Sequence, residues 1–431
     1  MNYEQCLAYL DSIQNLGIKF GLDNVRAILL ALGNPHLEYP SLLVAGSNGK
    51  GSVCAMLARI LELHGYRTGL YTSPHLIDLR ERIRLNGRMV SRQCFCRNLT
   101  ALKDCIDELI AKKILISVPT YFEMMTCLAF LCFKERKVNM AVLEVGMGGR
   151  FDATNVVTPL VSVITTISGE HKKYLGDTLA RIAFEKAGII KPDVHVVCGV
   201  RHGEAYDVIK KRAEELKAPF FGVFNGKRRL ETMKRGGKFA FTYRSDSREY
   251  SFCPSLRGEH QGRNAAIAVA AAEVLSGIHE KIPSETVVRG VESTLWEGRL
   301  EVYSQNPLVL LDGAHNEEGA LALRNYIREF VSPPVILIFA VMRDKEIDLL
   351  ADILFPLAKK VFLTSFPYFR AASPREIKGR TKFHEKIVLE PVVRRAVQRA
   401  LHEAGPDGSV VVAGSLFLVG EVKRIWGQVF A

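Results

Sequence analysis

The chain has 431 residues, of which 48% are hydrophobic and 24% charged. That composition is typical of a globular protein, the length favours two or three domains, and no apolar run approaches the roughly 18 residues of a membrane helix. The net charge of +12 comes without a helix-turn-helix, zinc-finger or RNA-binding pattern, so we expect neither a nucleic-acid nor a membrane partner. The densest basic stretch, Lys227–Lys238, fits a solvated hairpin, with attraction of small anions as the alternative.

Nine cysteines are spread along the chain. Their odd number and apolar surroundings predict reduced, buried thiols rather than a disulfide framework. Cys94 and Cys96 are too close together and too isolated for a zinc site. The N-terminal pattern MNYEQCLAYLDSIQNLG is amphipathic and lacks a basic region followed by an apolar core, so we expect no signal peptide and a cytoplasmic location.

In chain order, the first half alternates short β-branched runs with helical patterns. Strands are expected at 41–45, 67–72, 140–145, 160–167 and 194–198. Helices between them include 52–64 and 120–136. This alternation predicts an α/β fold with a mostly parallel sheet of the P-loop type and helices on both faces.

The pattern changes near residue 219. Residues 219–256 predict short strands and turns, and 261–276 predict a helix. A second alternation follows, with strands near 308–312, 335–340, 360–365 and 409–413. We therefore predict an ATP-binding N-terminal domain over 1–297 and a smaller, doubly wound α/β domain over 298–431.

The stretch AGSNGKGSV at 45–53 places a glycine loop between an expected strand and an expected helix. Glycines let backbone N–H groups approach phosphate oxygens, the helix N-terminus and Lys50 add positive potential, and the Ser52 hydroxyl can approach Mg²⁺. The spacing differs from G-x-x-x-x-G-K-[ST], because a glycine stands between the lysine and the serine. A plain glycine turn is the alternative to the phosphate site that we predict.

Five motifs occur in order: GSNGKGS at 46–52, TSPHL at 72–76, LEVGMGGRFDATN at 143–155, EKAGIIKP at 185–192 and DGAHN at 312–316. Together they resemble the bacterial folylpolyglutamate synthase/dihydrofolate synthase family of the Mur ligase superfamily, and the resemblance covers essentially the whole chain. It implies an ATP-dependent amide ligase, active as a monomer. The carboxylate of dihydropteroate, or the γ-carboxylate of a folate, takes the γ-phosphoryl group of ATP, and the amine of L-glutamate attacks the acyl phosphate.

Two other functions stay open. One is a related Mur-type ligase with a different carboxylate acceptor. The other is a non-catalytic nucleotide-binding regulator.

The resemblance also implies two Mg²⁺ ions and their ligands. Glu144 would bridge the ions, Ser73 would bind one and His171 the other, and Mg²⁺ prefers hard oxygen ligands. Lys186 would be carbamylated, because an ammonium beside two Mg²⁺ ions would be repelled whereas a carbamate is an anion. An ordinary exposed lysine is the alternative. The implied catalytic set consists of Lys50, His171 and Lys186.

Nucleotide contacts are implied in both halves. Asn264 would face the adenine, Arg299 would reach the ATP phosphates and Asp312 would hold the ribose hydroxyls, with a linker salt bridge as the alternative for Arg299. An amide can hydrogen-bond to a base edge, a guanidinium binds phosphate, and a carboxylate accepts hydrogen bonds from a diol. The whole implied set is Asn48, Gly49, Lys50, Gly51, Ser52, Asn264, Arg299 and Asp312.

His315 and Ser415 are implied on the L-glutamate side, which would make domain closure part of catalysis. The implied pterin side comprises Gly21, Leu22, Asp23, Thr120, Tyr121, Phe122, Glu123, Phe151, Asp152 and Ala153. Aromatic faces suit a flat pterin, and a carboxylate can pair with its amino-pyrimidine edge. The run TYFE at 120–123 also fits a helix start with core aromatics.

The chain departs from the family pattern at four places. Aspartate is usual where Glu170 stands, a small or apolar residue where Lys172 stands, and proline where Glu297 and Glu317 stand. None of these departures removes an implied ligand. They concern the metal loop and the stiffness of the linker.

Overall fold

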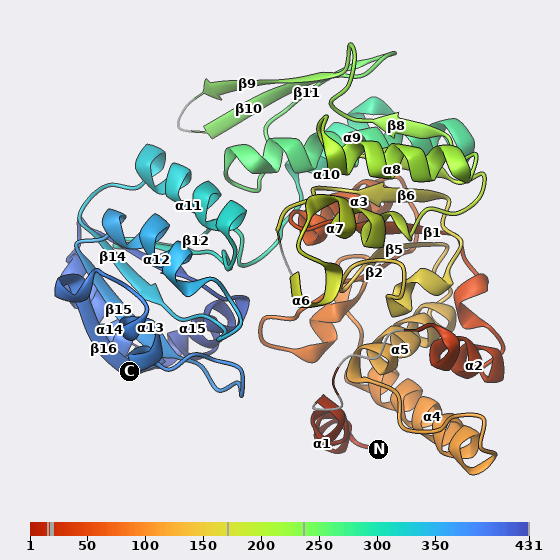
Figure 1. Ribbon diagram of the computed structural model, residues 1–431, viewed down its shortest axis with the longest axis horizontal. Helices are drawn as coiled ribbons and strands as arrows, with labels where there is room; N and C mark the ends of the chain where they lie inside the picture. Colours follow the sequence, from red (N-terminus) through yellow and green to blue (C-terminus); the bar gives the residue numbers. More distant parts are fainter. Residues whose placement is uncertain (15–16, 18–20, 170–171, 236–237, 430–431) are drawn as a thin grey trace.

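The structure is a computed structural model that describes residues 1–431 except 15–16, 18–20, 170–171, 236–237 and 430–431. Two α/β units lie side by side, each built on its own sheet (Figure 1). The α/β fold class expected from the sequence is confirmed.

The first unit contains an eight-stranded sheet in the order β4-β3-β2-β5-β1-β6-β7-β8. Six of these strands are parallel, and β3 and β4 add an antiparallel edge that the sequence analysis missed. The strands are β1 (Ser41–Ala45), β2 (Thr68–Tyr71), β3 (Ile83–Leu85), β4 (Arg88–Met89), β5 (Met140–Glu144), β6 (Val161–Ile164), β7 (His195–Cys198) and β8 (Phe220–Gly222).

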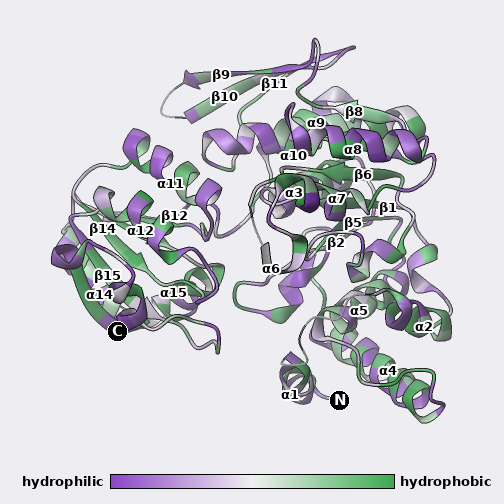
Figure 2. Ribbon diagram, in the orientation of Figure 1, coloured by the Kyte–Doolittle hydropathy of each residue, from purple (hydrophilic) through white to green (hydrophobic). Residues whose placement is uncertain are grey.

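Helices cover both faces of this sheet because successive strand residues point to opposite sides. In β1, Leu42 and Val44 belong to one buried core and Leu43 and Ala45 to the other. The first core is closed by α3 (Lys50–Leu63), α9 (Glu259–Ile278) and α10 (Ser284–Glu292). The second is closed by α1 (Tyr3–Ile13), α2 (Asp23–Ala31), α4 (Arg92–Ala111), α5 (Tyr121–Glu135), α7 (Leu179–Ala187) and α8 (Glu204–Glu215). Figure 2 shows the apolar strands between these layers.

Short helical turns connect several of these elements. They are η2 (Pro35–Leu37), η3 (Leu79–Arg82), η4 (Ala153–Val156) and α6 (Lys172–Leu175) in the first unit, and η5 (Phe355–Leu357) and η6 (His384–Lys386) in the second. Of these, η3 and η4 follow β2 and β5 in the chain and bring their residues to the edge of the sheet where those strands end.

The packing of α10 on α3 predicts a strong effect of one methyl group. A Cβ at Gly290 would lie 2.8 Å from the Ile60 Cα and 3.0 Å from its backbone nitrogen. We expect Gly290→Ala to destabilise the protein by about 1 to 3 kcal/mol, because the helices must move apart. Calorimetric melting would show this as a lower melting temperature. In the control Gly277→Ala, no atom lies within 4 Å of the added Cβ, so we expect a gain of about 0.5 to 1 kcal/mol; equal melting temperatures for the two variants would contradict the prediction.

A small antiparallel sheet lies beside α9, formed by β9 (Arg229–Arg235), β10 (Lys238–Arg244) and β11 (Glu249–Phe252). The basic stretch found in the sequence therefore lies in a hairpin. Figure 1 shows this sheet reaching toward the second unit. There the Phe239 ring meets the Phe330 ring edge-on at 5.2 Å, and Lys234 pairs with Glu329.

The second unit has a six-stranded sheet in the order β12-β13-β17-β14-β15-β16, parallel except for β12. Its strands are β12 (Glu301–Gln305), β13 (Leu308–Leu311), β14 (Val335–Phe339), β15 (Lys360–Ser365), β16 (Ile387–Val392) and β17 (Ser409–Ala413). One face is covered by α11 (Glu317–Phe330), α12 (Ile347–Leu354) and α13 (Pro374–Gly379), and the other by α14 (Val393–Ala404) and α15 (Leu416–Val429). This is the doubly wound arrangement that the sequence predicts.

The segment between the units is held by an ion-pair network. Glu297 stands where the family usually has proline, and its carboxylate pairs with Lys423 of α15 at 3.0 Å. The same ammonium pairs with Glu301 of β12 at 2.7 Å. An ionic tether to α15 thus occurs where a proline would have restricted the backbone. Over the described residues, none of the helices has the length and apolarity needed to cross a bilayer.

Candidate functional site

Two cavities lie at the carboxyl ends of the strands and are lined from both units. The first measures about 410 Å³ and the second about 230 Å³. Both are lined by Ser73, Pro74, Gly146, His315 and Leu416, which follow β2, β5, β13 and β17. The cavities therefore meet where the two sheets face each other, as expected for ligands of open α/β sheets.

The glycine loop lines the second cavity and requires its glycines. Gly46 and Gly49 have φ angles of 149° and 83°. A Cβ would lie 1.8 Å from the Thr165 Oγ1 at Gly46 and 2.2 Å from the Asn264 Oδ1 at Gly49. The Lys50 Nζ donates to the backbone carbonyls of Gly46 at 2.7 Å and Ser47 at 3.1 Å. The helix α3 begins at Lys50, two residues earlier than expected, and Gly51 and Ser52 form its first turn, lining the same cavity.

Lys186 is one of the largest fully buried side chains, which overturns the alternative of an exposed lysine. Its Nζ donates to the Gly46 carbonyl at 2.9 Å, the same oxygen that the Lys50 Nζ reaches. The two lysine side chains therefore meet at one carbonyl oxygen of the glycine loop.

Glu144 ends β5 and its Oε2 accepts a hydrogen bond from the Ser73 backbone N–H at 2.9 Å. Burial raises the pKa of this carboxyl, while Lys50, the Ser73 N–H, Arg299 and Arg82 act in the opposite direction. A cation at this carboxylate would further favour its charged form. Ser73 and Glu144 thus offer oxygen donors of the kind that Mg²⁺ takes.

The third implied metal ligand, His171, lies outside the described residues, as does Glu170. Among the residues that the structure does describe, no group of three or more His, Cys, Asp or Glu side chains is placed to hold a metal ion.

Asn264, Arg299 and Asp312 all line the second cavity together with the glycine loop. Asp312 also has a structural part, because its Oδ2 accepts from the Leu300 N–H and its Oδ1 from the Ala314 N–H, both at 2.8 Å. Burial raises its pKa, opposed by Arg299. Within the described part of the chain, Arg299 forms no ion pair, so the structure does not form the linker salt bridge that was its alternative.

The glycine loop also touches the second unit directly. The Asn48 side chain donates to Glu318 of α11 and accepts from the Asn316 side chain at 2.8 Å. Asn316 is the N-cap of α11, where its Oδ1 accepts from the Gly319 N–H, and Glu317, which replaces the usual proline, is the first helical residue. The loop and the start of α11 are thus joined by side-chain hydrogen bonds.

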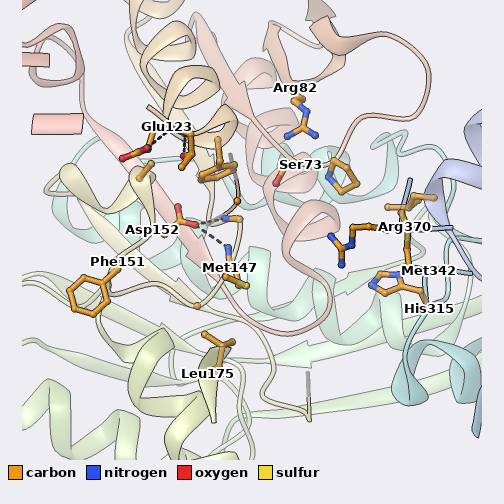
Figure 3. A pocket seen from close by; sticks show the side chains of 18 of the residues that line it. Ser73, Arg82, Glu123, Met147, Phe151, Asp152, Leu175, His315, Met342 and Arg370 are labelled. Carbon is orange, nitrogen blue, oxygen red and sulfur yellow. Dashed lines mark hydrogen bonds between the residues drawn. The ribbon is translucent and has the colours of Figure 1, made fainter. Parts of the chain in front are cut away.

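The first cavity is lined by most of the implied pterin residues, and Figure 3 shows several of them. These are Gly21, Thr120, Phe122, Glu123, Phe151, Asp152 and Ala153. Leu22, Asp23 and Tyr121 are not among its lining residues: Leu22 is buried before α2, Asp23 points into solvent and Tyr121 lies beneath Arg82.

Two of the lining carboxylates are largely used by the fold. Thr120 and Glu123 form a capping box at the start of α5, so the helix-start interpretation of TYFE is confirmed. Asp152 accepts hydrogen bonds from the N–H groups of Gly146, Met147 and Thr154 and from the Thr154 hydroxyl. Burial raises the pKa of Asp152, and these hydrogen bonds oppose that shift.

From the second unit, His315 and Ser415 line the first cavity, and His315 also lines the second. The His315 Nδ1 lies 2.8 Å from the Gly313 carbonyl, and the Ser415 Oγ accepts from the Phe417 N–H at 3.1 Å. Other lining residues were not predicted from the sequence, among them Arg82, Met147, Met342, Lys345 and Arg370. Two of them had a local signal, because Met147 lies inside the motif at 143–155 and Arg82 follows TSPHL by a few residues.

The family of the chain follows from its match to known domains. Residues 44–272 match the Mur ligase middle domain, and residues 298–416 match the Mur ligase, glutamate ligase domain. The chain belongs to the Mur ligase family. This Mur ligase is 33% identical to the dihydrofolate synthase/folylpolyglutamate synthase of Bacillus subtilis over 98% of each chain. It is 32% identical to the folylpolyglutamate synthase of Lacticaseibacillus casei, also over 98% of each.

Solved structures agree with this placement. The Mycobacterium tuberculosis folylpolyglutamate synthase complexed with ADP and AMPPCP superposes with a TM-score of 0.90 at 29% identity, covering 99% of each chain. E. coli FolC in complex with DHPP and ADP gives 0.88 at 26% identity, covering 100% of this chain and 99% of the other. Within the Mur ligases, the protein is thus a member of the folylpolyglutamate synthase/dihydrofolate synthase family, ligases that form carbon–nitrogen bonds.

Proposed function

We propose that this Mur ligase uses ATP to join L-glutamate through an amide bond to dihydropteroate, to the γ-carboxylate of (tetrahydro)folates, or to both. The observation that carries the proposal is the meeting of the two cavities at Ser73, Gly146 and His315. A nucleotide on the glycine loop would bring its terminal phosphate to this junction, and an acceptor in the first cavity would bring its carboxylate. Support also comes from relatives solved with ADP, AMPPCP and DHPP.

The reaction divides into two steps. An oxygen of the acceptor carboxylate forms a bond to the γ-phosphorus of ATP, and the bond to the bridging oxygen of ADP breaks. The glutamate amine then adds to the acyl carbon, phosphate leaves and the nitrogen loses a proton. Binding and alignment of these anions is the main task of such a site.

The lining of the second cavity supports the proposed nucleotide contacts. Backbone N–H groups of the loop with Lys50 and Ser52 hold the phosphates, and Arg299 adds a guanidinium to them. Asn264 faces the base and Asp312 the ribose hydroxyls. His315 and Ser415 face the amino acid.

Two Mg²⁺ ions would be held by Ser73, Glu144 and His171. The buried Glu144 carboxylate beside Ser73 supports this assignment, and that of His171 rests on the family motif. When bound, the ions supply positive charge that neutralises the phosphate oxygens during transfer.

Carbamylation of Lys186 completes the proposal for the metal side. The neutral amine would form an N–C bond to CO₂ and release one proton, giving an anion beside the cations. The carbamate nitrogen keeps one N–H, which can still donate to the Gly46 carbonyl. The shared use of that carbonyl by Lys50 and Lys186 supports the change.

We also propose an oligomeric state, a domain division and a cellular location. The protein is a monomer with domains over 1–297 and 298–431, and the separate sheets of the two units support that division. All nine cysteines are free thiols, which supports a location in the reducing cytoplasm.

The test is a direct assay of glutamyl transfer. The purified protein is incubated with ATP, Mg²⁺ and L-glutamate, with dihydropteroate in one reaction and tetrahydrofolate in the other, and mass spectrometry detects the glutamyl increment. Product in both reactions identifies a bifunctional enzyme, and product in one assigns the single activity. Reactions without ATP serve as controls. Binding of ATP with product in neither reaction would overturn the proposal in favour of another acceptor or a regulator.

A further inference from the structure

Arg82 is a buried guanidinium without a carboxylate partner among the described residues. It ends η3, directly before β3, and is 8% exposed. Its Nε donates to the His75 Nδ1 at 3.0 Å, and the guanidinium carbon lies 5.4 Å from the centre of the Tyr121 ring. These contacts orient the guanidinium, and its two terminal nitrogens, which have no hydrogen-bond partner among the described residues, are left for another ligand.

The neighbouring Arg80 shows what an internally neutralised arginine looks like in the same turn. Its Nη2 lies 2.6 Å from the Asp78 Oδ2, and its Nε also donates to that carboxylate. A buried charge without a counterion is costly unless something else pairs with it. Arg82 therefore has the features of a group that pairs with a ligand.

The place of Arg82 in the site indicates which ligand that is. It lines the first cavity together with Ser73, and its charge acts on Glu144 at the junction. Figure 3 shows the guanidinium pointing toward Ser73. Lys50 and Arg299 line the second cavity, where the phosphates are proposed to bind. Lys345 and Arg370 of the second unit also line the first cavity, and Arg370 pairs with Asp344 at 2.7 Å. Arg82 is the cation that the first unit places on the acceptor side of the junction.

We propose that Arg82 binds the reacting carboxylate of the acceptor, and that His75 is a positioning residue that aims the guanidinium. This inference rests on the proposed function. A guanidinium binds a carboxylate through two parallel N–H groups. The oxygen that does not attack phosphorus becomes the carbonyl oxygen of the acyl phosphate, and it takes up negative charge when the glutamate amine adds. Arg82 stays on that oxygen through both steps.

Steady-state kinetics of matched variants test the assignment. For Arg82→Gln we expect the KM for the acceptor to rise about 10- to 100-fold, as for loss of a charged hydrogen bond, with the KM for ATP changed by less than about threefold. Arg82→Lys keeps the charge but loses the fork, so it falls between wild type and Arg82→Gln. Arg80→Gln makes the same change two residues away and is expected to leave the acceptor KM unchanged. Equal effects on both KM values, or none on the acceptor, would overturn the inference.

The proposed role of His75 in positioning Arg82 has its own test. His75→Asn offers an amide oxygen in place of the Nδ1 acceptor, whereas His75→Leu removes the acceptor. We expect the acceptor KM of His75→Asn to stay near that of wild type, and His75→Leu to resemble Arg82→Gln at an unchanged melting temperature. In Arg82→Ala, added guanidinium ion should restore part of the turnover. The same loss in both His75 variants would show that Nδ1 does not orient Arg82.

Calorimetric binding of pteroate separates this inference from the proposed function. Wild type should bind pteroate more tightly than its neutral primary amide, and Arg82→Gln should lose that preference. A preference that survives in Arg82→Gln overturns the role of Arg82 even if glutamyl transfer is observed. Loss of the preference in a protein that makes no glutamyl product would keep Arg82 as the carboxylate-binding group and overturn only the proposed reaction.

Discussion

Replacing Lys186 with alanine is expected to lower kcat by about three orders of magnitude, in line with the loss of a preorganised charge at a transition state. The fully buried side chain reaches the glycine-loop carbonyl of Gly46, so its removal takes away both a loop contact and the proposed carbamate. Turnover of the purified variant with saturating ATP, L-glutamate and acceptor measures the effect. Added formate or acetate should restore part of the rate, because a small carboxylate can occupy the vacated anion site.

Lys191→Ala is the matched control for this prediction. Lys191 lies in the same motif and its Nζ also donates to a backbone carbonyl, that of Asn155 at 2.9 Å, but it lines neither cavity. We expect its kcat to change by less than about threefold. Undiminished turnover of Lys186→Ala would refute the catalytic role, and a loss that no carboxylate repairs would refute carbamylation alone. Carbon-13 NMR with labelled bicarbonate gives an independent readout, a carbamate signal present only when Lys186 is.

Gly49→Ala is expected to weaken ATP binding by at least about 100-fold, because the change both strains the backbone and crowds the nucleotide cavity. The residue has a φ of 83°, which side chains rarely adopt, and the new Cβ would lie 2.2 Å from the Asn264 Oδ1. Either the loop or Asn264 must move, and both line the second cavity. Titration calorimetry with the non-hydrolysable AMPPCP measures the affinity without turnover.

Gly65→Ala separates backbone strain from damage to the site. Gly65 follows α3 with a φ of 104°, and no atom lies within 4 Å of a Cβ there. We expect this variant to lose stability while binding AMPPCP like wild type. If Gly49→Ala also keeps wild-type affinity, the glycine loop is not the phosphate site.

The sequence could predict those parts of the site that depend on local chemistry. The β-branched runs at 41–45 and 140–145 form parallel strands. Residues that follow neighbouring parallel strands meet at the same edge of the sheet, which places Ser73 beside Glu144. The glycine loop at 46–52 follows the same logic. The capping box of Thr120 and Glu123 was also readable, because a threonine followed three residues later by glutamate is a helix-start signal.

Other parts depend on long-range packing and left no local signal. The antiparallel edge of β3 and β4 consists of three and two residues, too few for a period-two pattern. The 20-residue helix α4 begins at a Ser91 cap that apolar periodicity alone did not single out. That Arg82 has no carboxylate partner among the described residues becomes visible only when η3, α5 and the second unit are in place. The sequence shows which arginines exist, but not which of them lack a partner.

The hydrogen bonds of Asn48 with Asn316 and Glu318 have a thermodynamic consequence. Because they join the glycine loop to the start of α11, the conformation of the loop and the docking of the second unit depend on each other. Linkage is reciprocal, so the factor by which docking changes nucleotide affinity is the factor by which nucleotide changes docking. His315 and Ser415, which are proposed to face L-glutamate, are carried by the second unit. On that proposal, we expect the affinities for nucleotide and L-glutamate to be coupled, so that each has a defined value only at a stated concentration of the other ligand.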